Sequence, residues 1–296
     1  MSILISLVGE QPIPVLLPAV QLKPDQHVLV CSAETEPVAK RLQKFGEGWQ
    51  VKLLKSPYNL EAMITALHEI AVGEDLFFNL TGGTKLMSLA MYRVAMETRS
   101  RFGYLESQNH RSDFYVYAVQ GDSILSEPVM EISESLSIDQ YLQAHLDDYE
   151  ETGISQIEGG RLEQWVKAAL EKAGFETKAG VRPAKAGGQL EIDLVVRKNN
   201  QVGIVEIKSG DKKGESSKKG IDQLTTAGAR EYLGTYTARF LVVARGQERY
   251  IKELAQAQRV NLIEIPHYDA VREKSESDRE KLVDLVSDTL LGRKRR

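Results

Sequence analysis

Short apolar runs alternate with helical patterns through residues 1–120 of the chain. Runs that are apolar throughout predict strands buried on both faces, which occur where helices cover both sides of a parallel sheet. The chain therefore begins with a predicted parallel, doubly wound α/β sheet, and such sheets bind ligands beyond the carboxyl ends of their strands. The predicted strands are Ile3–Val8, His27–Cys31, Val51–Leu54, Asp75–Leu80, Arg101–Glu106 and Phe114–Val119, and the predicted helices are about Thr35–Phe45, Asn59–Ala71 and Thr84–Thr98.

The pattern changes at residues 121–155. Gly121, Pro128 and an acidic run from Asp147 to Gly153 are typical of a connector, which contains one short predicted helix around Ile138–Leu146. A chain of 296 residues suits two domains of about 150 residues each. The sequence therefore predicts a first domain at residues 1–125, a connector at 126–157 and a second domain at 158–296.

The second part follows a different order of elements, written αβββαβαβ. Two of its first three strands are predicted to form a hairpin. The last stretch, Arg272–Arg296, has the pattern of a charged amphipathic helix and ends in the basic residues 293–296. The other predicted elements, in chain order, are Arg161–Ala173, Phe175–Lys178, Gln189–Arg197, Val202–Lys208, Ile221–Leu233, Phe240–Val243, Arg249–Gln258 and Val260–Ile265.

The hairpin carries the strongest chemical pattern in the sequence. Asn199-Asn200 suits the two central positions of its turn, because Asn tolerates a positive φ. Residues whose numbers sum to 399 then face each other, so Asp193 faces Glu206. In the same register, Glu191 faces Lys208. Opposed side chains share one sheet face with Cβ atoms about 5 Å apart. Two carboxylates held this close predict a divalent cation between them, and oxygen ligands suit Mg²⁺ or Mn²⁺.

The residues around the hairpin strengthen this interpretation. Lys208 shares the charged face with Glu206 and can orient an attacking water or stabilise the charge that grows on a phosphorane. Glu163, on the preceding helix, can supply a third carboxylate, and Gln223 lies on the following helix. A plain amphipathic hairpin with a solvated charged face is the alternative interpretation. The apolar positions that predict packing behind the charged face are Leu190, Ile192, Leu194, Val196, Val205 and Ile207.

Glu163, Asp193 and Glu206-Ile207-Lys208 resemble the motif of the PD-(D/E)xK nucleases on their αβββαβ core, over roughly residues 158–265. The resemblance implies that Asp193 and Glu206 bind metal, assisted by the backbone carbonyl of Ile207 and by Glu163, either directly or through water. It makes Lys208 the catalytic lysine and places Gln223 where many members carry a supporting polar residue. Ile192 stands in place of the proline in the motif's name, a departure that many members share.

Basic residues gather just after this motif, with Gly and Ser between them. A flexible basic loop beside a metal site can hold a phosphodiester backbone without reading its sequence. A solvated surface loop is the alternative. The residues are Lys208, Lys212, Lys213, Lys218 and Lys219.

A Gly-Gly turn follows the fourth predicted strand, in Thr81-Gly82-Gly83-Thr84-Lys85, and a helix begins directly after it. Backbone amides at such a helix N-terminus can approach an anion. Thr81 and Thr84 add hydroxyls, and Lys85 adds a cation. The spacing of a P-loop is absent, and a simple helix start is the alternative.

Together with Asn79-Leu80, this loop resembles the signature loop of the CRISPR-associated Rossmann-fold (CARF) domains, and Val8–Pro14 resembles the loop after their first strand. The resemblance covers about residues 1–120. It implies that both loops line a pocket across the two-fold axis of a homodimer. The implied ligand is a cyclic oligoadenylate, commonly the tetra-adenylate made by type III CRISPR complexes. The implied ligand-binding residues are Gly82, Gly83, Thr84 and Lys85, with Thr81, Glu10 and Gln11 nearby.

Bulk properties set further limits. The net charge of −4 does not indicate a general nucleic-acid binder, so a polyanion must meet a local basic patch. The single cysteine, Cys31, excludes an intrachain disulfide and a multi-cysteine metal site, and it favours a cytoplasmic protein. No apolar run approaches the roughly 20 residues of a membrane span, so no membrane partner is expected.

The sequence thus predicts a metal-dependent endonuclease that a cyclic oligoadenylate activates and that cleaves RNA, DNA or both. A nucleotide-sensing regulator that binds nucleic acid without cutting it is the alternative. Two features of the sequence argue against this alternative. It shows no winged helix-turn-helix with a basic recognition helix, and the catalytic set of Asp193, Glu206 and Lys208 is complete. A third hypothesis is a phosphodiesterase that degrades the cyclic nucleotide at the N-terminal site. The strandedness of the substrate, its base preference, the number of metals and the ring size of the activator stay open.

Overall fold

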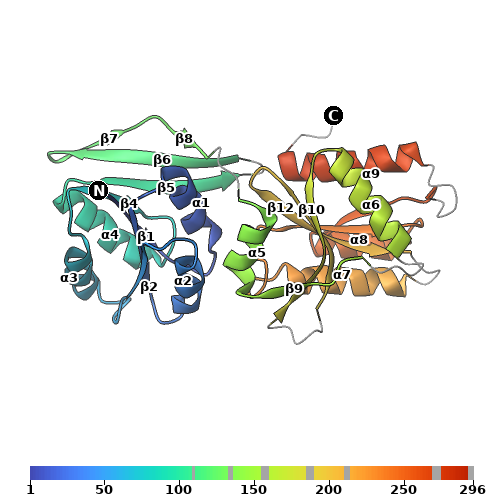
Figure 1. Ribbon diagram of the computed structural model, residues 1–296, viewed down its shortest axis with the longest axis horizontal. Helices are drawn as coiled ribbons and strands as arrows, with labels where there is room; N and C mark the ends of the chain where they lie inside the picture. The colour runs from blue at the N-terminus through green and yellow to red at the C-terminus, as the bar shows by residue number, and fades with distance from the viewer. Residues whose placement is uncertain are drawn as a thin grey trace. The chain divides into compact units, whose positions relative to one another are not determined.

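The computed structural model describes residues 1–108, 111–132, 136–154, 160–184, 190–209, 214–268 and 275–292. The chain divides into two compact units, Met1–Leu136 and Ser137–Arg296, each with its own sheet (Figure 1). Among the described residues, no helix is both long and apolar enough to cross a membrane.

The first unit is built on a sheet with the strand order β3-β2-β1-β4-β5-β6-β7, and β8 pairs with β6. Strands β1 to β5 pair in parallel, as predicted. Strand β6 runs antiparallel to β5, so the prediction of a parallel sheet is correct for β1 to β5 and wrong at this edge. Only residues 109 and 110 separate these two strands, and a parallel crossover needs about a dozen residues or more. The strands are β1 Ser2–Leu7, β2 Gln26–Cys31, β3 Trp49–Leu53, β4 Asp75–Asn79, β5 Arg101–Gln108, β6 Arg111–Gln120, β7 Ser123–Ser126 and β8 Met130–Glu131.

Helices cover both faces of this sheet, which is the doubly wound arrangement (Figure 1). Met63 of α3 and Met91 of α4 share one buried cluster with Ile5 and Phe78 of the central strands. Figure 1 shows α1 and α2 on the side of the sheet opposite α3 and α4. The helices are α1 Ile13–Leu22, α2 Glu36–Gln43, α3 Leu60–Ile70 and α4 Lys85–Glu97.

Helix α1 is an element that the sequence pattern did not predict. Its apolar run is interrupted by Pro12, Pro14 and Pro18, and prolines in such number are typical of a loop. Proline is tolerated in the first turn of a helix, because the amides there have no intrahelical partner. Pro12 and Pro14 occupy that turn, while Pro18 lies inside the helix and is itself buried.

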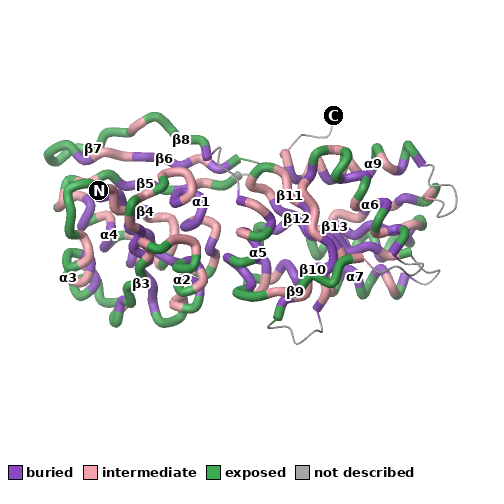
Figure 2. Tube along the Cα trace, in the orientation of Figure 1, coloured by how far each residue is buried: buried purple, intermediate pink, exposed green. Residues whose placement is uncertain are grey.

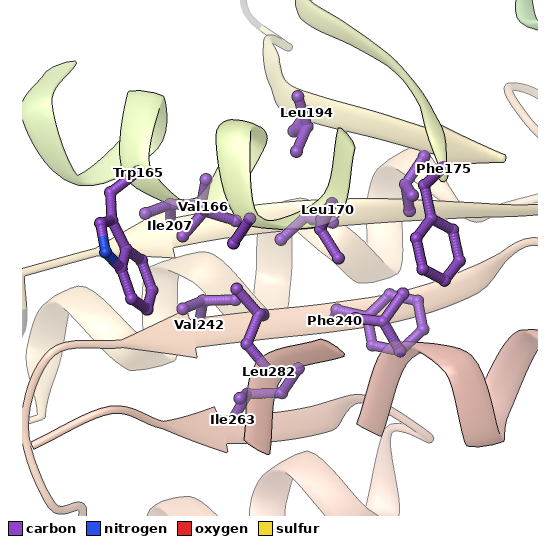
Figure 3. Packing of buried hydrophobic residues seen from close by; sticks show 14 of the residues in the cluster. Trp165, Val166, Leu170, Phe175, Leu194, Ile207, Phe240, Val242, Ile263 and Leu282 are labelled. Carbon is purple, nitrogen blue, oxygen red and sulfur yellow. The ribbon is translucent and has the colours of Figure 1, made fainter. Parts of the chain in front are cut away.

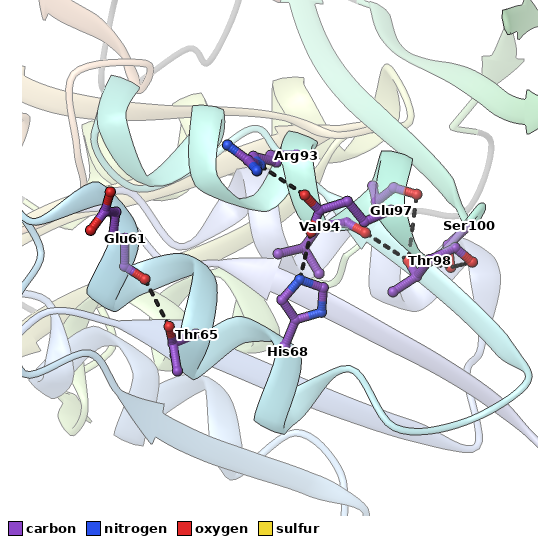
Figure 4. A network of polar contacts seen from close by, with 9 residues as sticks. Glu61, Thr65, His68, Arg93, Val94, Glu97, Thr98 and Ser100 are labelled. Atoms are coloured by element: carbon purple, nitrogen blue, oxygen red, sulfur yellow. Dashed lines mark hydrogen bonds and ion pairs between the residues drawn. The ribbon is translucent and has the colours of Figure 1, made fainter. Parts of the chain in front are cut away.

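Polar contacts also join α3 and α4 at the surface (Figure 4). Nε2 of His68 lies 2.7 Å from Oε2 of Glu97, and Nε of Arg93 donates to Oε1 of the same carboxylate at 2.8 Å. All three side chains are exposed, and exposed pairs of this kind add little to stability. The buried apolar face therefore holds these helices in place.

The second unit contains a sheet in the order β14-β13-β12-β11-β10-β9. Strands β9 to β12 pair antiparallel, and β13 and β14 continue the sheet in parallel. Residues 126–157, read from the sequence as a connector, contain regular elements of both units: β8 pairs with β6, and β9 pairs with β10. The elements are α5 Ile138–Leu146, β9 Tyr149–Glu151, α6 Gly160–Lys172, β10 Glu176–Pro183, β11 Ile192–Lys198, β12 Gln201–Lys208, α7 Glu215–Ala227, β13 Ala238–Val243, α8 Arg249–Ala257, β14 Asn261–Glu264 and α9 Glu276–Leu291.

Helices α6 and α9 cover one face of the second sheet. Val166 and Leu170 of α6 and Leu282 of α9 pack against Phe240 and Val242 of β13 in one buried cluster (Figure 3). The central strands of this sheet are buried over most of their length (Figure 2). The hairpin is therefore a rigid support for whatever its other face presents.

Two helices differ in extent from their predictions. Helix α7 begins at Glu215 and ends at Ala227, whereas the sequence predicted Ile221–Leu233. Gly214, with φ +70, precedes it and Gly228 follows it, and both positions are common helix boundaries. Helix α9 lies within the predicted tail helix, and residues 269–274 and 293–296 lie outside the described residues.

Candidate functional site

The hairpin of β11 and β12 has the predicted register. Its pairs run from Leu194–Val205 to Lys198–Gln201, each summing to 399. Asn199 in the turn has φ +55, a left-handed conformation that Asn tolerates better than most residues. The alternation of apolar and charged residues and the conformation of the turn therefore support the same hairpin register.

Strand alternation decides which side chains form the site. Leu194 of β11 and Val205 and Ile207 of β12 belong to the buried cluster with α6 and α9. Successive side chains on a strand point to opposite faces, so the residues beside these three point away from that cluster. The residues on this opposite face include Asp193, Glu206 and Lys208.

Asp193 occupies the point at which the two strands stop pairing. Its Oδ2 accepts a hydrogen bond from the amide of Ile207 at 2.7 Å, just beyond the last strand pair, Leu194–Val205. The N–H and C=O of one strand residue point to the same edge, so the carbonyl of Ile207 also points toward Asp193. Burial raises the pKa of Asp193, and the charge of Lys208 and the Ile207 amide act against this rise.

Glu206 is a buried carboxylate paired with a lysine. Its side chain is 2% exposed and accepts a hydrogen bond from Nζ of Lys208. Burial, and after it the negative charge of Asp193, raises the pKa of Glu206 to about 8. Burial by itself lowers the pKa of Lys208, but the nearby carboxylates outweigh it and raise this pKa. A single ammonium group therefore faces the buried carboxyl group of Glu206 and the partly buried one of Asp193.

Glu163 and Gln223 reach the same region from two helices. Glu163 lies in the first turn of α6, and burial followed by the charge of Asp193 raises its pKa. A Cβ on Gly220 would lie 3.3 Å from Cγ of Glu206, so α7 crosses the catalytic face there. Gln223 stands one helical turn further along α7, half-buried and without a hydrogen bond to any described residue.

The donor set fits a divalent cation. The carboxylates of Asp193 and Glu206 and the carbonyl of Ile207 are oxygen ligands, which Mg²⁺ and Mn²⁺ prefer. A cation between the two carboxylates favours their ionised forms, against the effect of burial. Within the described ranges, no three His, Cys, Asp or Glu side chains form a cluster that could hold a metal by themselves.

The basic residues that follow β12 are described only in part. Lys212 and Lys213 lie outside the described residues. Lys218 and Lys219 lie on α7 and are exposed. These two lysines are therefore exposed charges on the helix that crosses the catalytic face.

In the first unit, two loops meet at the carboxyl ends of β1 and β4, which are parallel neighbours. A Cβ on Gly82 would lie 1.9 Å from the carbonyl oxygen of Leu7, and one on Gly9 would lie 3.2 Å from the amide nitrogen of Gly83. Gly83 itself has φ +69. The loops thus approach backbone to backbone, which the absence of side chains permits.

Asn79, at the end of β4, organises the second loop. Its Nδ2 donates to the carbonyl oxygen of Pro14 at 3.1 Å, and its Oδ1 accepts from the hydroxyl of Thr81 at 2.6 Å. The same hydroxyl accepts from the amide of Leu105 at 2.8 Å. Thr81 is therefore occupied in holding the loop. Sequence reasoning did not single out Asn79, although a buried polar residue directly after an apolar strand is a usable signal.

The other predicted ligand-binding residues differ in their exposure and in the contacts that they make within the protein. Thr84 caps α4, because its Oγ1 accepts from the amide of Met87 at 3.2 Å. Lys85, the first residue of α4, is exposed and has no ion pair with a described residue. In the loop before α1, Glu10 is exposed and Gln11 is half-buried. Lys85 therefore places an exposed cation at the N-terminus of α4, the end of a helix that favours an anion.

Comparisons with known families give the same division of the chain. The family model of the Card1 CARF domain matches residues 3–141. The family model of a restriction endonuclease matches residues 154–268. No curated protein matches this sequence.

Solved structures share this fold at low sequence identity. Can2 from Sulfobacillus thermosulfidooxidans, solved with cyclic tetra-adenylate, has a TM-score of 0.74 and 12% identity over 98% of this chain and 99% of its own. Protein VC1899 from Vibrio cholerae has a TM-score of 0.66 and 13% identity over 96% of each chain. A type III CRISPR defence DNA nuclease activated by cyclic oligoadenylate has a TM-score of 0.54 and 15% identity over 86% of this chain and 51% of its own. The chain therefore consists of an N-terminal Card1-type CARF domain and a C-terminal restriction-endonuclease-like domain.

Proposed function

We propose that this chain is a metal-dependent endonuclease of type III CRISPR antiviral defence, which cleaves RNA or DNA when a cyclic oligoadenylate binds its CARF domain. The observation that carries the proposal is the hydrogen bond from the Ile207 amide to Asp193, beside the buried pair of Glu206 and Lys208. These contacts bring Asp193, Glu206 and Lys208 together on one face of the sheet, at the end of β12. A regulator that only binds nucleic acid has no need of a buried carboxyl group beside a second, partly buried one, because their desolvation is costly.

Each side chain of the catalytic face has a separate role in the proposed hydrolysis. Lys208 is protonated and orients the attacking water or stabilises the charge that develops on the phosphoryl oxygens. Mg²⁺ or Mn²⁺ held by Asp193, Glu206 and the carbonyl of Ile207 would stabilise the attacking and leaving oxygens as a Lewis acid. Glu163 would extend the acidic cluster, as a metal ligand either directly or through a water. Gln223 offers an uncharged hydrogen-bonding group from α7.

The loops of the CARF domain would hold the phosphates of the activator. The amides of Gly82 and Gly83 precede α4, whose N-terminus favours an anion, and Thr84 and Lys85 add a hydroxyl and a cation. Can2 was solved with cyclic tetra-adenylate, and this supports the same class of ligand for a chain of the same fold. A cyclic tetranucleotide is quasi-symmetric, so two copies of the chain, related by a two-fold axis, would share one ring and present Glu10 and Gln11 twice.

A cleavage assay tests both parts of the proposal. Labelled single-stranded RNA and supercoiled plasmid are incubated with Mg²⁺ or Mn²⁺, with and without cyclic tetra-adenylate. The wild type is compared with Glu206→Ala/Lys208→Ala, and we expect cutting that requires both the ligand and the intact motif. The matched control is Arg249→Ala/Glu253→Ala, which removes an exposed ion pair on α8 and should cut like the wild type.

Each failure of this assay has a different meaning. Ligand binding without cutting under any condition would overturn the nuclease and favour the nucleotide-sensing regulator. Cutting that ignores the ligand would keep the nuclease and overturn the switch, because an activator must bind the active arrangement more tightly. Cutting that survives chelation by EDTA would overturn the metal dependence.

A further inference from the structure

Arg182 of β10 is bonded to Glu191, which stands just before β11. Nη2 of Arg182 donates to Oε2 of Glu191 at 2.7 Å, and Oγ1 of Thr152 donates to Oε1 of the same carboxylate at 2.6 Å. Thr152 is itself fixed, because its amide donates to the carbonyl oxygen of Gly180 at 2.8 Å. Both oxygens of Glu191 are thus occupied by protein donors.

These side chains lie on the catalytic face of the sheet. Ala179 of β10 and Leu194 of β11 belong to the buried cluster with α6 and α9. Arg182 is three positions after Ala179, and Glu191 is three positions before Leu194. Glu191 also lies two positions before Asp193, whose side chain is on the face that carries Glu206, and the hydrogen bond to Glu191 holds the Arg182 guanidinium beside it.

They also lie at the catalytic end of the sheet. β10 ends at Pro183, β11 begins at Ile192 and β12 ends at Lys208, and both pairings among these strands are antiparallel. The end of β10, the start of β11 and the end of β12 therefore lie at the same edge of the sheet. The charge of Glu191 reaches the site, where it adds to the rise that burial causes in the pKa of Asp193, although Lys208 and the Ile207 amide, which lower this pKa, have larger effects.

Glu191 supports the arginine and is not available to a metal. With both oxygens engaged, Glu191 acts as a fixed anchor for the guanidinium.

Most of the Arg182 guanidinium is uncommitted. Arginine carries five N–H donors, and Glu191 is the only acceptor that the described residues offer to Arg182. Nε is buried without a partner, whereas Nη1 has no partner among the described residues and is not buried. The side chain is 33% exposed, so this free edge of the guanidinium faces solvent on the catalytic face.

We propose that Arg182 binds a backbone phosphate of the nucleic-acid substrate close to the phosphate that is cut, and that Glu191 and Thr152 hold the arginine for this contact. The proposal rests on the proposed nuclease function. β11 separates β10 from β12, so Arg182 and Lys208 lie on strands that are two strand spacings, about 10 Å, apart. A nucleic-acid strand advances about 3.4 Å per nucleotide, so the contacted phosphate lies within about three nucleotides of the scissile one. Guanidinium groups suit this role because their fork of donors matches phosphate oxygens.

Binding measured without cleavage tests this contact. Fluorescence anisotropy follows labelled single-stranded RNA and duplex DNA on the full chain with cyclic tetra-adenylate, in EDTA so that nothing is cut. We expect Arg182→Gln to weaken binding about tenfold, as for one charge-assisted hydrogen bond. The slope of log K against log salt should also fall, by about 0.9 for duplex DNA or about 0.7 for a single strand. Arg249→Gln, an arginine 91% exposed on α8, is the matched control and should change neither quantity.

Two further substitutions test the positioning roles. Thr152→Val removes the hydroxyl that holds Glu191 and should weaken binding a few-fold, while Thr152→Ser, which keeps the hydroxyl, should restore it. Glu191→Gln keeps the shape and one acceptor oxygen for Arg182. It should therefore change affinity only slightly and leave the metal requirement for cleavage as it is, whereas loss of Mn²⁺ binding in this variant would make Glu191 a metal ligand and overturn its supporting role.

The outcomes separate this proposal from the nuclease proposal. An unchanged affinity and salt slope in a folded Arg182→Gln would overturn the phosphate contact, even if the wild type cuts. A wild type that never cuts, with a reduced slope in Arg182→Gln, would overturn the nuclease and keep the contact. If Arg182→Gln does not fold, Arg182→Lys replaces it. That variant should retain the salt slope but lose affinity, because lysine keeps the charge without the fork.

Discussion

Oδ2 of Asp193 accepts a hydrogen bond from the amide of Ile207 at 2.7 Å, where β11 and β12 stop pairing. A side-chain carboxylate thus takes the position of a backbone partner and ties one strand of the hairpin to the strand that carries Glu206 and Lys208. The bond also fixes the direction of the Ile207 carbonyl. The metal-binding geometry therefore depends on the backbone as much as on the side chains.

Asp193→Asn separates the structural role of this residue from its charge. Asparagine can still accept the hydrogen bond from Ile207, so we expect little change in the thermal midpoint. It carries no charge, so the affinity for Mn²⁺ should fall by at least about tenfold, the lower range for losing support at a metal site. Isothermal titration calorimetry measures this, with Asp222→Asn on the exposed side of α7 as the control. Undiminished Mn²⁺ binding would show that Asp193 is no ligand.

His27 makes the stability of the first unit depend on pH. It is fully buried, with Nε2 2.8 Å from the hydroxyl of Ser6 and its ring 4.3 Å from that of Trp49. Burial lowers the pKa of His27 from 6.5 to about 3. Below pH 6.5, His27 therefore binds a proton in the unfolded chain but stays neutral in the folded chain until the pH approaches 3. Stability is complete above that pH and falls as the pH drops toward 3, by about 2 kcal/mol at pH 5.

Chemical denaturation between pH 7.5 and pH 5 checks the role of His27. His27→Gln cannot take up the proton, so its stability should fall less over this range than that of the wild type, although it begins lower at pH 7.5. His267→Gln, at an exposed position, should follow the wild type. Equal pH dependence in His27→Gln and the wild type would mean that His27 does not control this stability.

Local patterns account for the features that were predictable. The hairpin register follows from period-two alternation and a turn at Asn199, and both features can be recognised from neighbouring residues in the sequence. The direction of β6 was not predicted, because it depends on the two-residue connection to β5. Helix α1 was not predicted, because its prolines are typical of a loop.

Contacts between distant segments account for what the sequence did not reveal. Thr152, Arg182 and Glu191 come from separate segments, and only the pairing of β9, β10 and β11 brings them together. Thr81 was expected near the ligand, yet its hydroxyl bridges Asn79 and Leu105, a contact with β5 that no local pattern encodes.

Thr81 and Lys85 should therefore respond differently to substitution. Thr81→Val leaves Asn79 and the Leu105 amide without their shared partner, so we expect a lower thermal midpoint. Lys85→Ala removes an exposed cation at a helix N-terminus, so it should leave the midpoint unchanged and weaken the binding of cyclic tetra-adenylate. Differential scanning fluorimetry and calorimetric titration give the two readouts. A Lys85→Ala protein that binds the ligand normally would remove Lys85 from the site.

Gly82 should not tolerate any side chain. A Cβ there would lie 1.9 Å from the carbonyl oxygen of Leu7, so Gly82→Ala must separate the two loops. We expect a loss of about 1–3 kcal/mol in the stability of the first unit, as for other overpacked sites, together with loss of ligand binding. Gly246→Ala is the control, because nothing lies within 4 Å of the added Cβ. A stable Gly82→Ala with full ligand affinity would contradict the backbone contact between the loops.

Lys208 should affect catalysis and metal binding in opposite directions. Its ammonium group is bonded to Glu206 and competes there with a cation for the same carboxylate. Lys208→Met removes the competitor while keeping much of the side-chain volume, so Mn²⁺ should bind at least as tightly as in the wild type. The rate of cleavage should nevertheless fall by about 10²–10³-fold, since the group that stabilises the developing charge is gone. Calorimetric titration and single-turnover cleavage at saturating Mn²⁺ measure the two effects, with Lys218→Met on the exposed face of α7 as the control. A parallel loss of Mn²⁺ affinity and rate would mean that Lys208 organises the metal site, and would contradict its assignment to the chemical step.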